Sequence, residues 1–108
     1  MHTKEMQNNT GFQNDLDARG LELAANTLKA IAHPMRMAIL YLLKREGRMS
    51  VTQIYGALGL EQAVASHHLG ILKDKGVLGS SREGKNTFYY LGKPELAQVL
   101  DIVQQSLR

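Results

Sequence analysis

The stretch that decides the fold runs from Ser50 to Lys75 and reads SVTQIYGALGLEQAVASHHLGILKDK. It opens with a capping-box pattern, in which the Ser50 hydroxyl can accept from the backbone amide of Gln53 while the Gln53 side chain reaches back. This pattern predicts a short helix that ends at Gly59. A second helix over about 62–75 follows almost at once, with Ala65, His68, Leu69 and Leu72 on its inward stripe. Two short helices joined by a glycine-containing turn of about four residues are typical of a helix-turn-helix.

Apolar periodicity predicts further helices on both sides of this motif. From Leu16 to Ala32 apolar residues recur at three- and four-residue steps, which is the period of a helix. Pro34 interrupts that helix and suits the first turn of a second one, which we expect to end at Gly47. Near the other end of the chain, Pro94 opens a helix that continues to the C-terminus.

Between the helix-turn-helix and the last helix the pattern becomes that of strands. Two short runs, 77–82 and 86–91, are joined by Glu83-Gly84-Lys85, and the second run is rich in aromatic and β-branched residues. They predict a β-hairpin with a charged tip, here called the wing. The predicted fold class is therefore mainly α with a small β-hairpin, a winged helix-turn-helix in the order α-α-α-α-β-β-α.

Composition limits the kind of protein. A length of 108 residues fits one domain, which we place over 15–108, after a polar, flexible N-terminal arm over 1–14. The chain has no cysteine, which excludes disulfides and thiolate metal sites. Its longest apolar run, Met37 to Leu43, is seven residues, far below the roughly 20 of a membrane helix. We expect a soluble, cytoplasmic protein without membrane contacts.

Positive charge is concentrated in the middle of the chain. From Arg36 to Lys93 there are nine basic and four acidic residues, whereas the segments on either side each carry a net charge of −1. A basic centre between nearly neutral ends favours an anionic partner for the central segment. A solvated basic surface without a partner is the alternative reading.

The second helix of the motif is the predicted DNA-reading element, because such a helix reads bases in the major groove with its outward side chains. Glutamine can pair with adenine, serine with either partner of a base pair, and histidine with a base or a phosphate. The alternative is that each of these residues is an ordinary solvated side chain. The predicted contacts on this helix are Gln62, Ala63, Ser66, His67 and Lys73.

Two further groups complete the predicted DNA contacts. Ser50 and Thr52 lie at the start of the preceding helix, and Arg82, Lys85 and Asn86 lie at the tip of the wing. A hairpin beside a reading helix can lay such side chains along a phosphate backbone or into a minor groove. The alternative is a charged loop that keeps the hairpin soluble.

Five segments of the chain, taken in this order, carry a resemblance to a known family. They are AHPMR at 32–36, QAVASHHL at 62–69, GVL at 76–78, REGK at 82–85 and the tyrosine pair at 89–90. Together they resemble the ArsR/SmtB family of dimeric winged-helix bacterial repressors. The resemblance covers about residues 21–107 and implies DNA contacts at Gln62, Ser66 and His67, with Arg82 and Lys85 on the wing.

The chain also departs from the family pattern. Glu61 stands where the family often has serine, and glutamate is a poorer N-cap that repels phosphate. Ala65 occupies a position that is β-branched in the family, with Val64 beside it, which we interpret as local repacking.

The family's metal sites are missing from the sequence. The segment 49–53 has no cysteine for a thiolate site, and the last helix contains Glu95 and Asp101 but no histidine. His67 and His68 are adjacent and face different sides of a helix, so they do not readily share a metal. We expect His68 to be a core histidine and His33 to lie at a helix start. The prediction is therefore no metal and no cofactor.

Apolar stripes on the first and last helices lie outside the helix-turn-helix and the wing. They cover part of the domain's own core, and we also expect them to pack against a second copy, as terminal helices do in the family. A two-fold dimer would match a palindromic operator, and a small effector of unknown identity would bind between these helices. The predicted dimer contacts are Leu21, Leu28, Leu96, Val99, Leu100, Val103 and Leu107.

Together these patterns predict a dimeric, sequence-specific transcriptional regulator that binds double-stranded DNA and acts as a repressor. A winged-helix module for protein–protein contact, without DNA binding, is the alternative. We do not expect an enzyme, because the sequence has no cysteine nucleophile, no His-Glu metal motif, no phosphate loop and no nucleophile elbow. No catalytic residue is predicted.

Overall fold

The computed structural model describes residues 17–108, and the arm predicted over 1–14 lies outside the described residues. Residues 17–108 form five helices and three strands. In chain order these are α3 (Ala18–Ile31), α4 (Pro34–Glu46), β1 (Arg48–Ser50), α5 (Val51–Leu58), α6 (Gln62–Asp74), β2 (Leu78–Glu83), β3 (Asn86–Leu91) and α7 (Glu95–Ser106). Each predicted helix is present, with ends that differ by a few residues at most.

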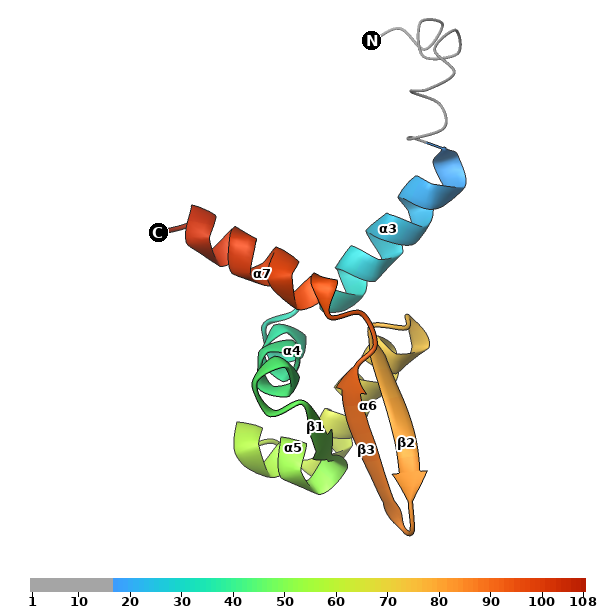
Figure 1. The fold of residues 1–108 in the computed structure, drawn as a ribbon, viewed down its shortest axis with the longest axis vertical. Coiled ribbons are helices and arrows are strands. Elements are labelled where there is room, and N and C mark those ends of the chain that lie inside the picture. The colour runs from blue at the N-terminus through green and yellow to red at the C-terminus, as the bar shows by residue number, and fades with distance from the viewer. Residues whose placement is uncertain (1–16) are drawn as a thin grey trace, which may run out of the picture.

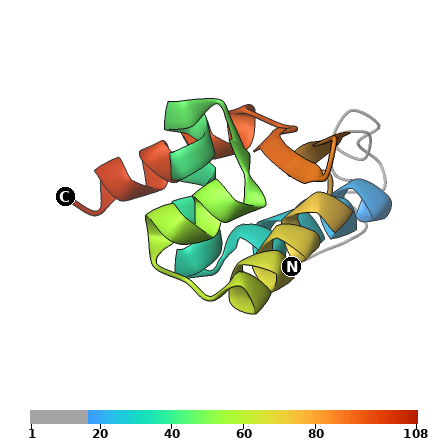
Figure 2. The ribbon, with the colours of Figure 1, turned by 90° about the horizontal axis from the view of Figure 1, so that it is seen from below.

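The elements form a body with two projecting helices. Helices α3 and α7 diverge on one side of the body, while α4, α5, α6 and the sheet lie beneath them (Figure 1). The β2–β3 hairpin extends away from the body on the opposite side. Seen from that side, α5 and α6 lie next to each other in front of the remaining helices (Figure 2). The helix-turn-helix and the wing therefore occupy one end of the molecule and the terminal helices the other.

The helix-turn-helix forms as the sequence predicts. The Ser50 Oγ accepts from the Gln53 amide at 3.1 Å, and the Gln53 Oε1 accepts from the Ser50 amide at 2.8 Å, which confirms the capping box. Gly59 ends α5 with φ of 65°, in the left-handed region that favours glycine. Three residues separate α5 from α6.

One strand was not predicted. Segment 48–50 forms β1, which pairs antiparallel with β3 and gives a three-stranded sheet in the order β1-β3-β2. The predicted order α-α-α-α-β-β-α is therefore incomplete by one strand between α4 and α5. A three-residue strand is too short for a period of two to be recognised, and its partner lies about 40 residues further along the chain, where Met49 pairs with Tyr89.

A single apolar core fixes α6 against the rest of the body. Its largest fully buried side chains come from α4, α5, α6 and the residue just before β2. They are Ile39, Leu40, Leu43, Ile54, Leu69, Leu72 and Val77. The four positions predicted to face inward on α6, which are Ala65, His68, Leu69 and Leu72, are all buried. Since the inward face of α6 is fixed by this packing, its outward face has a defined orientation.

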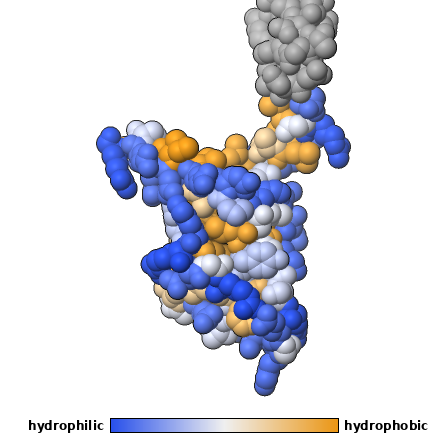
Figure 3. Space-filling model, viewed as in Figure 1, coloured by the Kyte–Doolittle hydropathy of each residue, from blue (hydrophilic) through white to orange (hydrophobic). Residues whose placement is uncertain are grey.

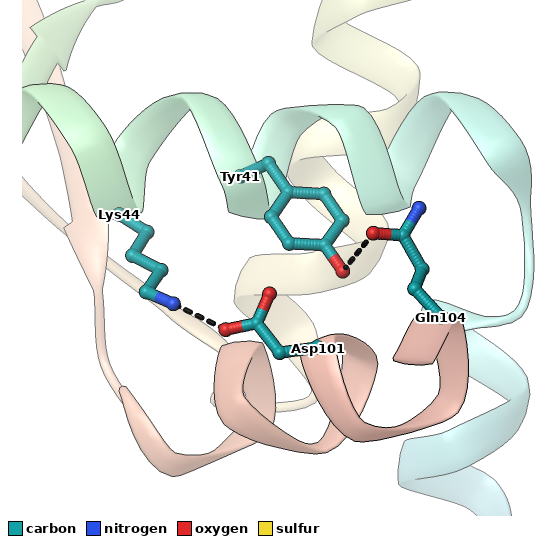
Figure 4. A network of polar contacts seen from close by, with 4 residues as sticks. All are labelled: Tyr41, Lys44, Asp101 and Gln104. Atoms are coloured by element: carbon teal, nitrogen blue, oxygen red, sulfur yellow. Dashed lines mark hydrogen bonds and ion pairs between the residues drawn. The ribbon is translucent and has the colours of Figure 1, made fainter. Parts of the chain in front are cut away.

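Polar contacts join α7 to α4 (Figure 4). The Tyr41 hydroxyl donates to the Gln104 Oε1 at 3.1 Å, and Lys44 forms an ion pair with Asp101. Partial burial and the nearby Asp101 carboxylate raise the pKa of Tyr41 above its usual range, so that its hydroxyl keeps its proton. These contacts set the direction in which α7 leaves the body. No helix within 17–108 has the length and apolar character needed to cross a membrane.

Candidate nucleic-acid interface

The outward face of α6 is open to solvent. All five predicted contacts on this helix are exposed, whereas Ala65 and His68, on the opposite side, are buried. Val64 is also exposed, at 39% of its surface, while its neighbour Ala65 fills the core position. The exposed contacts are Gln62, Ala63, Ser66, His67 and Lys73.

A polar cleft of about 240 Å³ lies between the N-terminal turns of α5 and α6 and the wing. It brings together six of the ten predicted DNA contacts, from three separate stretches of the chain. Its lining residues are Ser50, Val51, Thr52, Gln62, Ser66, Lys85, Asn86 and Thr87. We refer to it below as the polar cleft. The remaining four predicted contacts, Ala63, His67, Lys73 and Arg82, are exposed outside its lining.

Two lining residues were missed from the sequence. Val51 is the first residue of α5, and Thr87 lies on β3 opposite Arg82 of β2. Neither residue carries a charge, and Val51 lies inside the capping box at a position that the motif leaves unspecified. Their place in the polar cleft depends on where β3 passes α5, which no local pattern reveals. The alternation of β3 could have shown that Thr87 and Tyr89 share a face of the sheet, but not which element that face meets.

Charge at the tip of the wing is predominantly positive. Glu83 forms an ion pair with Arg48 of β1, and the Arg48 guanidinium also lies 4.0 Å from the centre of the Phe88 ring. In the described part of the chain, neither Arg82 nor Lys85 forms an ion pair. The Arg82 Nε donates to the carbonyl of Gly84 at 3.2 Å, which holds the guanidinium at the tip. The tip thus presents two cations whose charge no carboxylate offsets.

Two helices begin at this face, and their backbone amides add to its preference for anions. The Ser50 hydroxyl accepts from Gln53, which leaves its own proton available to an anion. At the start of α6, Glu61 occupies the N-cap position and forms no side-chain hydrogen bond to the helix. The first amides of α6 therefore remain available, although the carboxylate of Glu61 opposes an anion there, as predicted from the sequence.

The terminal helices form a second, chemically different surface. Hydrophobic residues gather along α3 and α7, while the tip of the wing is hydrophilic (Figure 3). The most exposed apolar residues of this second surface are Leu21, Leu23, Leu28, Val99, Ile102, Val103 and Leu107. We call this set the apolar terminal face. A groove of about 410 Å³ between α4 and α7 adjoins it, lined mainly by apolar side chains such as Met37 and Leu107.

The seven predicted dimer contacts differ in their exposure. Leu100 is 7% exposed and belongs to the core of its own chain, and Leu96 is partly buried against that core. Leu100 is therefore covered within one chain, because α7 turns this side toward α4. Leu21, Leu28, Val99, Val103 and Leu107 remain exposed.

The histidines occupy the predicted positions. His33 is the N-cap of α4 and accepts from the Met35 amide at 3.0 Å, and His68 is buried on the inner side of α6. His67 points outward. Within residues 17–108, no group of three histidine or carboxylate side chains is arranged to hold a metal ion.

Comparison with known proteins identifies the family. A model described as a helix-turn-helix domain matches residues 31–78. The chain is 38% identical over 86 residues to the HTH-type transcriptional regulator NmtR of Mycobacterium tuberculosis, a match that covers 80% of this chain and 71% of that protein. It is 40% identical over 84 residues to the transcriptional repressor SmtB of the same species, covering 77% of this chain and 62% of that one.

Solved structures support the same family as these sequence matches. The homodimeric winged helix-turn-helix DNA-binding domain of a Mycobacterium bovis protein, described as a possible ArsR-family transcriptional regulator, superimposes with a TM-score of 0.75 at 32% identity. The match covers 86% of this chain and 85% of that domain. The chain therefore belongs to the ArsR/SmtB family of winged helix-turn-helix transcriptional regulators.

Proposed function

We propose that this protein is a dimeric repressor that binds a palindromic DNA operator through α6, the start of α5 and the wing. The observation that carries the proposal is the polar cleft, in which hydroxyl, amide and ammonium groups from three stretches of the chain converge on one exposed face. These are the groups that contact base edges and phosphates.

Within this interface we assign different tasks to α6 and the wing. Gln62, Ser66 and His67 project from the exposed side of α6 and read base edges. Arg82 and Lys85 at the wing tip neutralise phosphates or enter a neighbouring minor groove. Binding of this kind weakens steeply as salt rises, because each phosphate contact releases condensed counterions.

The apolar terminal face supports the dimer. Exposed leucine and valine side chains on α3 and α7 lose contact with water when a second copy covers them. A two-fold dimer carries two copies of α6 and so fits two half-sites about one helical turn apart. A repressor of this form acts by occupying the promoter. A small effector would bind where the terminal helices of the two copies meet.

The test is selection of binding sites from a random duplex library at about 0.15 M salt, where nonspecific binding is suppressed. We expect an enriched imperfect palindrome with half-sites about one turn apart. The control is a double variant, Gln62→Ala with Lys85→Ala, which should enrich nothing while it stays folded and dimeric. If the unaltered protein enriches no sequence, the protein–protein module becomes the better description.

A further inference from the structure

One arginine side chain links three helices behind the DNA-reading face. The Nε of Arg36, on α4, donates to the carbonyl of Ala30 at the end of α3. Its Nη1 lies 3.3 Å from the Nδ1 of His68, on the buried side of α6. Arg36 therefore joins the end of α3 to the helix that carries the predicted base contacts, without lining the polar cleft itself.

This contact fixes the protonation state of His68. A guanidinium group has only donors, so the Nδ1 of His68 must accept and cannot carry a proton. The ring is then neutral, with its proton on Nε2. A second proton would turn the acceptor into a donor and would place an imidazolium beside the guanidinium. His68 is 7% exposed, so little water is available to replace the lost contact.

The surroundings of His68 disfavour the added charge. Burial is the largest cause that lowers its pKa, followed by His33, Arg36 and His67. The His33 ring lies 4.6 Å from the His68 ring and the His67 ring 5.4 Å from it. None of the groups that shift the pKa of His68 is a carboxylate.

Other elements also pack against α6, namely α3, α5 and β2. None of their ionisable groups contributes to the shift at His68. These groups are Arg19, Glu22 and Lys29 on α3, Tyr55 on α5, and Arg82 and Glu83 on β2.

We propose that Arg36 and His68 are positioning residues for DNA binding, which hold α6 against the junction of α3 and α4 only while His68 is uncharged. The inference rests on the proposed function, since it concerns how the reading helix is presented to DNA. Mild acid would protonate His68, break the contact with Arg36 and loosen α6. The dimer helices and the reading helix would then be uncoupled, which makes operator affinity sensitive to pH.

The direction of the effect follows from proton linkage. The pKa of His68 is lower in the folded chain than its ordinary value of 6.5, so the unfolded or loosened chain binds more protons. The stability that the Arg36–His68 contact provides is therefore complete above pH 6.5, and it is lost as the pH falls through the lower pKa of the folded state.

A first experiment needs no DNA. The full chain is labelled with ¹⁵N, and the amide hydrogen exchange of α6 is followed by NMR between about pH 8 and pH 5.5, after correction for intrinsic exchange rates. The variant His68→Asn carries an oxygen close to the position of Nδ1, which accepts from Arg36 but does not titrate. We expect protection of α6 to fall on acidification in the unaltered protein and to stay constant in His68→Asn.

Two further variants show which side chain causes the pH response of α6. His33→Asn keeps an N-cap acceptor on α4 and removes the neighbouring imidazole, so it should retain the pH response. Arg36→Met removes both donated hydrogen bonds and should show weak protection of α6 at every pH. Where Arg36→Met does not fold, the comparison of His68→Asn with His33→Asn still decides the matter.

The second experiment measures operator affinity at constant ionic strength over the same pH range. The ratio of the dissociation constants of the unaltered protein and His68→Asn cancels the effects of pH on every group that both proteins share. We expect that ratio to rise about fivefold or more on acidification. One pH unit below the ordinary histidine pKa of 6.5, protonation of His68 can favour the loosened chain by up to about tenfold. Absence of operator binding at every pH in both proteins would count against the proposed function and not against the exchange result. A pH response of α6 in His68→Asn equal to that of the unaltered protein, or none in either, would overturn the inference.

Discussion

The two ends of the molecule expose side chains of opposite polarity. The polar cleft and the wing tip present hydroxyl, amide and ammonium groups on elements held by the core, whereas the apolar terminal face presents aliphatic side chains on two helices that diverge from the body. The polar end is suited to a charged, hydrated partner and the apolar end to a partner that excludes water. Under the proposed function, one short domain separates DNA reading from self-association by placing the two tasks on different elements.

Charging the apolar terminal face should give the largest effect. Val103 is 46% exposed, so the substitution Val103→Glu is tolerated by a single chain but opposes burial against a second copy. We expect monomers on a sizing column and operator affinity reduced by roughly 10²–10⁴-fold, because two half-sites no longer act together.

The matched control is Gln105→Glu, which adds the same charge at an exposed polar position of α7. It should leave the dimer and its operator affinity intact. A dimer that persists in Val103→Glu would place the interface elsewhere and would break the contrast between the two ends.

Removing a side chain that reads bases should give the next largest effect. Gln62→Ala or His67→Ala should cost about 1–3 kcal/mol of binding free energy on the selected operator and relax its specificity. Competition titrations with base-pair variants of the operator measure both quantities. Affinity and specificity equal to those of the unaltered protein would show that the exposed side of α6 does not read sequence.

At the wing, a substitution should cause a smaller loss of DNA affinity, and this loss should not depend on the DNA sequence. Lys85→Ala should weaken binding to operator and random DNA alike and reduce the slope of log affinity against log salt by about one unit. The control is Lys29→Ala, which removes the same charge from α3, at the other end of the molecule, and should leave the slope unchanged. Equal slopes in all three proteins would exclude a phosphate contact at Lys85.

The smallest effect should come from the unsatisfied N-cap of α6. Glu61 forms no side-chain hydrogen bond there, and serine would accept from a free amide and remove a negative charge beside the predicted phosphate position. We expect Glu61→Ser to raise the free energy of unfolding by about 0.5–1 kcal/mol in urea denaturation and to tighten operator binding slightly. A loss of stability would show that Glu61 has a structural partner in solution.

Local sequence signals predicted most of the fold. The capping box at Ser50, the glycine stop at Gly59 and the inward stripe of α6 all rest on residues a few positions apart, and the structure confirms each of them. Strand β1 was missed because its partner β3 is distant in sequence. For the same reason Thr87 was missed as a lining residue of the polar cleft.

The contact between Arg36 and His68 was not predicted for the same reason, which is that the two residues are distant in sequence. The prediction that His68 is a core histidine is confirmed, but its partner lies 32 residues earlier on another helix. Periodicity places a residue on the inner or outer side of a helix and does not say which side chain it meets there. The exposed residues predicted to contact DNA and to form the dimer remain predictions.

The most direct test of the contrast between the two ends is an NMR titration of ¹⁵N-labelled protein with the selected operator duplex. We expect the largest chemical-shift changes at the start of α5, along the exposed side of α6 and at the wing tip, with little change in α3 and α7. Shift changes confined to α3 and α7, with α6 and the wing unaffected, would contradict the assignment of the polar end to DNA.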